Sequence, residues 1–252
     1  MQLTTLHLVR LSSTRLPMKA LMNIGEFTVI EHSILRALNF KIKPIICTSI
    51  NKEDDIFEEI AKKHKISFFR GSLMNKLKRI IDCANFYNLK YFHVVDVDDP
   101  YFDHIQIKKS IQLLIKNKLG VVKPSDKSSS GLASVGYSYD LDFLNRNINF
   151  HETDKVEMLD SFFNKKKLKK SIGKAQDISY FNIKARLTLD YIEDLNFFNC
   201  LNFIVGNFAT RKKVEKILYE NNDIPKINYF RNQEWSLRQK KIKINEAKLI
   251  SI

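Results

Sequence analysis

The stretch "LTTLHLVRLSSTRLPMKAL" (residues 3–21) joins an apolar run to a loop rich in positive charge. Its first part predicts a buried strand. "RLSSTRLPMK" (residues 10–19) then supplies three basic residues, three hydroxyl side chains and a Leu-Pro pair. Arginine offers a planar fork to phosphate oxygens, and lysine offers a compact charge. The grouping of Arg10, Arg15 and Lys19 therefore indicates a polyphosphate site, with a basic surface turn as the alternative.

Apolar runs and helix-like segments alternate from this stretch to residue 119. Strict alternation of this kind predicts an α/β fold with a parallel, doubly wound sheet. Ligands of such sheets bind beyond the carboxyl ends of the strands, where the basic loop also lies. The predicted strands are residues 3–10, 43–49, 66–72 and 91–100, and the predicted helices are residues 29–40, 54–65, 73–88 and 105–119.

The pattern is less regular after residue 120. Residues 121–140 predict a strand, a loop rich in Ser and Gly, and a second strand. Residues 152–163 predict a helix, and residues 182–205 predict a strand that runs into a helix near Tyr191. From residue 211 onward we expect a helix followed by polar, basic, extended chain.

Two acidic segments follow predicted strands. In "VDVDDP" (residues 95–100), strand alternation places Asp96 and Asp98 on one face and Asp99 on the other. Carboxylates beside a cationic loop repel one another unless a cation lies among them, and oxygen ligands suit Mg²⁺. Helix-capping aspartates are the alternative. Asp190, at the end of the predicted strand in "LTLDYIEDL", could reach the same cation as Asp98. Two acids on one metal, opposite a basic loop, predict nucleotidyl transfer.

The formal net charge is +14, from 42 Lys and Arg against 28 Asp and Glu. This charge is compatible with a non-catalytic, basic nucleic-acid-binding protein, but acids at the predicted site would repel a phosphate backbone that lacks a metal. Another nucleotide or glycosyl transfer on the same scaffold, or a degenerate partner subunit, also remains open. No apolar stretch could span a bilayer and no signal-peptide pattern is present, so we expect a cytoplasmic protein. Three scattered cysteines favour neither a disulfide framework nor a zinc cluster.

Several of these segments together resemble one family. "RLSSTRLPMKAL" is similar to the N-terminal signature of the sugar cytidylyltransferases, of the CMP-Kdo synthetase and acylneuraminate type, and the spore-coat polysaccharide branch is the most similar. "CTS", "FFRGSLMNKLKRI", "DVDDP" and "RLTLDYIEDL" resemble its further motifs in the same order. The family commonly has Gly where this chain has Ser12 and Met18, so a side chain there could narrow the loop or disturb a positive φ.

The resemblance implies a Rossmann-like, three-layer nucleotidyltransferase fold. It implies a single domain over residues 1–210, with a nucleotide-binding half (1–105) and an acceptor and dimerisation half (106–210). Residues 211–252 would form a C-terminal helix and basic tail. The protein would be a homodimer that uses CTP and Mg²⁺ to join CMP to an acidic sugar or similar anionic acceptor, releasing pyrophosphate, for surface polysaccharide or glycan synthesis. An acceptor that bears a phosphate or phosphonate remains open.

The resemblance also assigns site residues. Arg10, Arg15 and Lys19 would hold the triphosphate, and Asp98 and Asp190 would hold the metal. The acceptor would be selected by the second half, where a set of polar residues could contact it, although a solvated helix face is the commoner role for such residues. The nucleotide-binding residues would be Ser13, Thr48, Arg70 and Ser72, and the polar acceptor candidates are His151, Glu152, Asp154 and Glu157.

Overall fold

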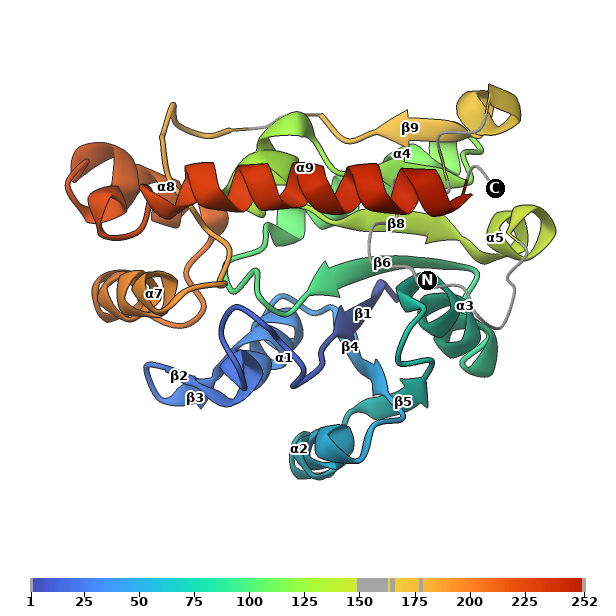
Figure 1. The fold of residues 1–252 in the computed structure, drawn as a ribbon, viewed down its shortest axis with the longest axis horizontal. Helices are drawn as coiled ribbons and strands as arrows, with labels where there is room; N and C mark the ends of the chain where they lie inside the picture. The colour runs from blue at the N-terminus through green and yellow to red at the C-terminus, as the bar shows by residue number, and fades with distance from the viewer. Residues whose placement is uncertain (1, 149–162, 164–165, 177–178, 251–252) are drawn as a thin grey trace.

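The computed structural model describes residues 2–148, 163, 166–176 and 179–250 (Figure 1). The predicted helix over residues 152–163 lies outside the described residues, apart from Phe163. The acceptor candidates also lie outside them; these are His151, Glu152, Asp154 and Glu157. The described strands are β1 (Thr4–Leu8), β2 (Asn23–Ile24), β3 (Phe27–Thr28), β4 (Lys43–Ser49), β5 (Ser67–Gly71), β6 (Tyr91–Asp96), β7 (Val121–Lys123), β8 (Tyr137–Asp140) and β9 (Ile172–Lys174).

The described strands form a seven-stranded sheet of order β5-β4-β1-β6-β8-β7-β9, beside a small β2-β3 hairpin. β5, β4, β1 and β6 pair in parallel, and so do β7 and β9. Only β8 is reversed, since it pairs antiparallel with both β6 and β7. The mostly parallel α/β sheet expected from the alternation of strands and helices is therefore confirmed.

Helices cover both faces of this sheet. The described helices are α1 (Val29–Asn39), α2 (Ile56–His64), α3 (Lys76–Phe86), α4 (His104–Lys116), α5 (Leu141–Asn147), α7 (Ile192–Val205), α8 (Arg211–Glu220) and α9 (Arg231–Ile250), with shorter helical turns η1 (Lys19–Leu21), η2 (Lys52–Asp55), η3 (Ser128–Leu132), η4 (Lys166–Ser171) and η5 (Ile224–Ile227).

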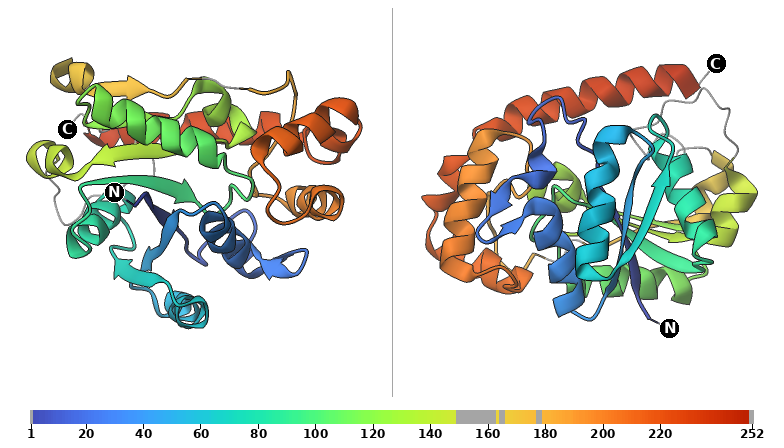
Figure 2. Two further views of the ribbon diagram at one scale, coloured as in Figure 1. Left: turned by 180° about the vertical axis from the view of Figure 1, so that it is seen from behind. Right: turned by 90° about the horizontal axis from the view of Figure 1, so that it is seen from below.

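Neighbouring side chains of one strand enter opposite cores, because they alternate across the sheet. On β4, Ile45 packs in the core beneath α3 and α5, whereas Ile46 packs in the core beneath α1 and α2. On β6, Val94 joins the first of these cores, and Val95 joins a core under α4. The result is three layers, with α3 and α5 on one face and α1, α2 and α4 on the other (Figure 2).

Three helix starts follow the local capping rules. Thr28 and Glu31 form a reciprocal capping box at the start of α1. Asn75 caps α3, and Asp103 caps α4 by accepting the backbone N–H groups of the first turn. These caps fix where each helix begins, and so they fix the length of the loops that precede α3 and α4 at the carboxyl edge of the sheet.

The structure corrects three expectations. Residues 182–190 join no sheet, although they carry the apolar alternation of a strand. Backbone N–H groups of this segment donate instead to the Gly131 and Asp98 carbonyls. β6 ends at Asp96, so the alternation proposed for Asp96, Asp98 and Asp99 does not apply beyond that residue. Residues 231–250 form helix α9 rather than extended chain. They contain neither Gly nor Pro, and Arg231 and Trp235 contact Glu193 and Arg186.

Helix α9 runs across the end of the molecule towards which the central parallel strands point (Figure 2, right). The N-terminus, from which β1 starts, lies at the opposite end in the same view. Among the described residues, no helix has both the length and the apolar character needed to cross a bilayer. The C-terminal helix thus lies at the edge of the sheet where ligands of this fold bind.

Candidate active site

A cavity of about 520 Å³ opens at the carboxyl edge of the central strands. Its walls come from parts of the chain that are far apart in sequence. They are the end of β1 and the loop after it, the start of α1, helix α3, the turn after β6, the segment that runs from β7 into β8, residues 188–190, and helix α9. The wall residues with polar or charged side chains include Arg10, Ser12, Ser13, Thr14, Arg15, Lys19, Lys76, Arg79, Asp96, Asp98, Asp99, Ser129, Tyr137, Thr188, Asp190, Arg238 and Gln239.

The basic loop turns back over the cavity within a few residues of leaving β1. Pro17 fixes one backbone dihedral, and Met18 takes a left-handed conformation with φ 56° immediately before η1. This turn aims Lys19 back towards the strand ends. Met18 thus adopts the positive φ that the family usually assigns to Gly, and its side chain avoids the cavity by lying 54% exposed to solvent.

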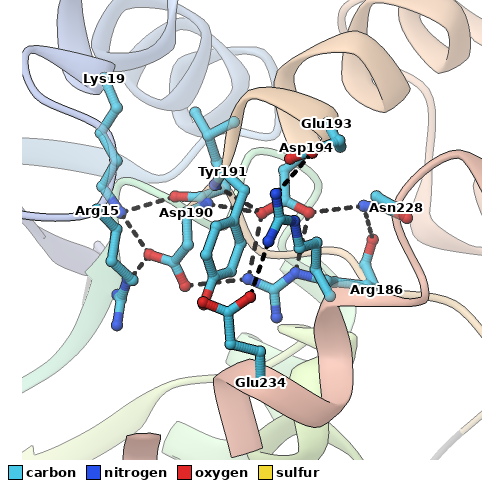
Figure 3. A network of polar contacts seen from close by, with 11 residues as sticks. Arg15, Lys19, Arg186, Asp190, Tyr191, Glu193, Asp194, Asn228 and Glu234 are labelled. Atoms are coloured by element: carbon cyan, nitrogen blue, oxygen red, sulfur yellow. Dashed lines mark hydrogen bonds and ion pairs between the residues drawn. The ribbon is translucent and has the colours of Figure 1, made fainter.

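Lys19 joins the two carboxylates that the sequence proposed as metal ligands. Its Nζ lies 2.5 Å from Asp98 Oδ2 and 2.9 Å from Asp190 Oδ1, and it also donates to the Leu189 carbonyl at 2.7 Å. Arg15 Nη2 donates to the same Asp190 oxygen at 2.5 Å (Figure 3). Asp98 and Asp190, 92 positions apart in the sequence, therefore converge on one point opposite the basic loop.

A buried ion pair holds Asp190 in this position. Arg186, whose side chain is fully buried, donates from Nη2 to Asp190 Oδ2 at 3.1 Å and from Nε to Asp194 Oδ1 at 2.9 Å. Asp194 also accepts the backbone N–H groups of Asp190 and Tyr191, and the Asn228 amide, which closes the network drawn in Figure 3. Asp194 thus stabilises the α7 N-terminus and also orders the residues before it.

These contacts set the protonation of the pair. Burial alone would raise the pKa of Asp190, but the charges of Lys19 and Arg15 outweigh it and hold that pKa at about 2. Burial would likewise lower the pKa of Lys19, and Asp98 and Asp190 raise it above its usual value. Asp190 is therefore a carboxylate, and Lys19 an ammonium, over the whole physiological range.

Asp99 differs from its neighbours. Its side chain is partly buried, and desolvation together with the charges of Asp98 and Asp96 raises its pKa well above the usual value. Lys76 pairs with Asp96 at 2.7 Å. Asp96, Asp98 and Asp190 each pair with a cation of the site, so Asp99 is the carboxyl group of the acidic turn whose ionised form is disfavoured.

The residues predicted to bind the nucleotide divide into two groups. Ser13 lines the cavity, as do Arg10, Arg15 and Lys19. Thr48, Arg70 and Ser72 are not among the described residues that line it. Their roles as nucleotide-binding residues stay predictions.

Each of these three side chains has a partner within the fold. Thr48 is fully buried, and its hydroxyl donates to the Val9 carbonyl at 2.7 Å. Arg70 donates to the Ser49 and Asn51 carbonyls and pairs with Asp55, while the Ser72 hydroxyl accepts the Asn75 N–H. These contacts order the turns after β4 and β5, beside the cavity rather than inside it.

Comparison with known proteins agrees with this geometry. The sequence profile of the family described as cytidylyltransferase matches residues 7–248. The chain belongs to the cytidylyltransferase family. Membership indicates a nucleotidyltransferase enzyme, and it includes the C-terminal helix, because the match continues into α9.

Related proteins share the fold at low sequence identity. A cytidylyltransferase structure from Leptospira borgpetersenii superimposes with a TM-score of 0.76 at 23% identity, over 89% of this chain and 97% of that one. CMP:2-keto-3-deoxy-manno-octonic acid synthetase complexed with CTP gives 0.59 at 12% identity, over 81% and 99%. The 4-diphosphocytidyl-2C-methyl-D-erythritol synthase of Anaerococcus prevotii gives 0.54 at 14% identity, over 79% and 97%.

One curated relative matches by sequence. The uncharacterized protein MJ1063 of Methanocaldococcus jannaschii is 28% identical over 133 residues, which are 52% of this chain and 54% of that protein. The match spans about half of that relative's length. It therefore supports common ancestry for a part of the chain rather than a shared activity.

Sequence reasoning missed several residues of this cytidylyltransferase site. Arg186 stands in the quoted motif "RLTLDYIEDL", and an arginine four residues before an aspartate at the site was a usable signal. Trp235, Arg238 and Gln239 lie in a segment that was expected to be extended tail, and they line the cavity from α9. Only the single tryptophan in an otherwise polar segment could have drawn attention to that helix.

Proposed function

We propose that this protein is a CTP-dependent cytidylyltransferase that joins CMP to an acidic sugar, releases pyrophosphate, and acts in surface polysaccharide or glycan synthesis. The observation that carries the proposal is the convergence of Asp98 and Asp190 on Lys19 Nζ, beside Arg15, in a member of the cytidylyltransferase family. The synthetase of similar fold that is complexed with CTP supports the choice of nucleotide.

The residues at the convergence point fit a magnesium ion. Mg²⁺ is usually bound by one or two carboxylates together with substrate phosphates and water. Asp98 and Asp190 are two such carboxylates, and the described residues hold no group of three or more His, Cys, Asp or Glu suited to a fully protein-made metal site. Asp98 and Asp190 would hold the ion, which would neutralise charge on the α-phosphoryl group.

The basic loop would bind the triphosphate on the opposite wall. Arg10, Arg15 and Lys19 would contact its phosphates and stabilise the leaving pyrophosphate as negative charge develops there. An acceptor oxygen would form a bond to the α-phosphorus as the bond from that phosphorus to the bridging oxygen of the β-phosphate breaks. Arg186, through Asp190 and Asp194, would keep the acidic wall in position while the substrates bind.

The test is a pyrophosphate-release assay with CTP, Mg²⁺ and 2-keto-3-deoxy-manno-octonate, with UTP, ATP and GTP in parallel. We expect release that requires CTP, the metal and the acceptor together. Asp98→Asn should abolish it, whereas Asp82→Asn, the same substitution in an ion pair on the surface of α3, should not.

The same assay should be run with a phosphate-bearing acceptor, 2-C-methyl-D-erythritol 4-phosphate. If the protein turns over only this acceptor, the acceptor is a sugar phosphate rather than an acidic sugar, and the proposed cytidylyl transfer still holds. Stabilisation of the protein by UTP but not CTP in a thermal-shift assay would contradict the choice of nucleotide. Full activity of Asp98→Asn and Asp190→Asn would contradict the metal assignment.

A further inference from the structure

The cavity has a second end that the proposed roles leave unused. We call the part of the cavity that is lined by helix α9 and by the segment from β7 into β8 its α9 end. The wall residues that carry side chains able to contact a ligand there are Pro124, Ser129, Tyr137, Trp235, Arg238 and Gln239.

Helix α9 is fixed against the site by side chains of the Asp190 network. Arg231 Nη2 pairs with Glu193 at 2.8 Å, and its guanidinium lies 4.9 Å from the centre of the Tyr191 ring. The Trp235 ring lies 5.3 Å from the guanidinium of buried Arg186. The indole is therefore oriented by the same arginine that holds Asp190, and a ligand on α9 would lie close to the acidic wall.

The β7–β8 segment approaches α9 closely at one point. Gly131 has φ +103°, and a Cβ at this position would lie 2.7 Å from Asn232 Oδ1 and 3.9 Å from Trp235. The Leu132 carbonyl accepts from Arg211, and the Gly131 carbonyl accepts from the Leu187 N–H. The approach of Gly131 to Asn232 brings the segment against α9, and the two carbonyl contacts tie the same segment to α8 and to residues 182–190.

The two ends of the cavity differ in charge. The wall near α3 includes the cations Arg10, Lys76 and Arg79, of which Lys76 pairs with Asp96. Together with Arg15 and Lys19 of the basic loop, they suit a triphosphate with several negative charges. Among the described residues that line the α9 end, Arg238 is the only cation, and the others are hydroxyl, amide or aromatic groups together with Pro124. One cation among neutral polar groups suits a ligand with one anionic group and several hydroxyls.

We propose that the α9 end of the cavity is the acceptor subsite, where Arg238 binds the anionic group of a polyhydroxylated acceptor and Trp235 packs against its carbon skeleton. The proposal rests on the cytidylyl transfer proposed above, and it assigns acceptor selection to a helix that the sequence left without a role. Ser129 and Gln239 would bind the acceptor hydroxyls. Carboxylate and phosphate share the required chemistry, and the experiment separates them.

Trp235 supplies the readout, because it is the single tryptophan of the chain. The full-length protein is saturated with Mg²⁺ and a CTP analogue that cannot be cleaved between the α- and β-phosphates. Tryptophan emission is then followed during titration with 2-keto-3-deoxy-manno-octonate, 2-C-methyl-D-erythritol 4-phosphate, or neutral erythritol. We expect one of the two anionic probes to change the emission, and erythritol to leave it unchanged. An emission that neither anionic probe changes would overturn the proposal.

Variants of α9 complete the test. Arg238→Ala should weaken binding of the effective probe by about tenfold or more, as the loss of a charge-assisted hydrogen bond predicts, and Arg238→Lys should restore part of it. Lys240→Ala removes a cation from the same helix outside the cavity lining, and should change nothing. Calorimetry should give unchanged CTP affinity for all three variants.

The main rival is a role for Arg238 in binding the triphosphate, since its Nη2 donates to Thr14 Oγ1 at 3.2 Å. A loss of CTP affinity in Arg238→Ala, with probe affinity retained, would overturn the acceptor subsite. A wild-type protein that binds no CTP in calorimetry and releases no pyrophosphate would overturn the proposed function itself. The two failures are therefore distinguishable in the same set of measurements.

Discussion

The two carboxylates at the centre of the site are positioned in different ways. Asp98 follows β6, so the hydrogen-bonded ladder of the sheet brings it to the cavity, and its side chain remains 26% exposed. Asp190 follows a segment outside the sheet, and its side chain is 1% exposed among Arg15, Lys19 and Arg186. Backbone hydrogen bonding of the sheet positions Asp98, whereas contacts with buried cations position Asp190. Changes at the second position should therefore cost stability as well as activity.

The largest expected effect tests this difference directly. Asp98→Asn and Asp190→Asn should each lower turnover by about 10³-fold, since the charge stabilisation lost with a metal ligand amounts to several kcal/mol. In urea unfolding, Asp98→Asn should lose less than about 1 kcal/mol. Asp190→Asn should lose about 3 kcal/mol, because buried cations lose their counter-charge. Equal stability losses in the two variants would mean that the carboxylates are held alike.

Arg186 should matter more for stability than for binding. Arg186→Met leaves Asp190 and Asp194 buried without their shared cation, and should lower the free energy of unfolding by about 3 kcal/mol. Arg146→Met makes the same change on an exposed arginine of α5, and should stay within about 0.5 kcal/mol of wild type. Unfolding by urea measures both. An Arg186→Met protein as stable as wild type would show that packing, rather than the charge of Arg186, holds Asp190 and Asp194 in place.

The first half of the chain should respond to acid through its buried histidines. Burial lowers the pKa of His7, His32 and His93 to about 3, whereas each titrates near 6.5 when unfolded. The unfolded state therefore binds more protons below pH 6.5, and stability should fall as the pH drops from 6.5 towards 3. Each histidine contributes up to about 1.4 kcal/mol per pH unit.

This acid response can be checked with one variant. His93→Gln removes a single buried imidazole, so the slope of unfolding free energy against pH between 6 and 4.5 should be smaller than that of wild type by roughly one histidine's contribution. Urea titrations at a series of pH values give both slopes. A variant slope identical to that of wild type would show that the imidazole is already protonated in the folded protein.

The smallest effect concerns the basic loop itself. Met18 occupies a left-handed conformation, which costs a residue with a side chain roughly 1 kcal/mol relative to glycine. Met18→Gly should therefore stabilise the protein by up to about 1 kcal/mol. Ser12→Gly is the matched control, because Ser12 is not among the described residues with a positive φ, and it should lose about 0.5 kcal/mol. A loss of stability in both variants would show that the Met18 side chain stabilises the loop.

The sequence determined the parts of this protein that depend on local pattern. Strand and helix periodicity located β1, β4, β5 and β6 and the helices between them, since each of these elements buries one regular face. The residues from Arg10 to Lys19, and Asp98, follow strands that are parallel neighbours. Their meeting at one edge was therefore predictable from alternation alone. The same logic failed at residues 182–190, where apolar alternation persists without a partner strand.

Tertiary structure decided the rest. Which carboxylate pairs with which cation depends on distances across the fold, so neither the Lys19 bridge nor the Arg186 network is encoded in any local pattern. Helix α9 was not predictable from local pattern because its residues are mostly polar. Its helical state is supported by contacts of Arg231 and Trp235 with residues 38 and 49 positions earlier. A periodic pattern predicts which face of a helix or strand is buried, whereas the residues that this face contacts depend on the tertiary fold.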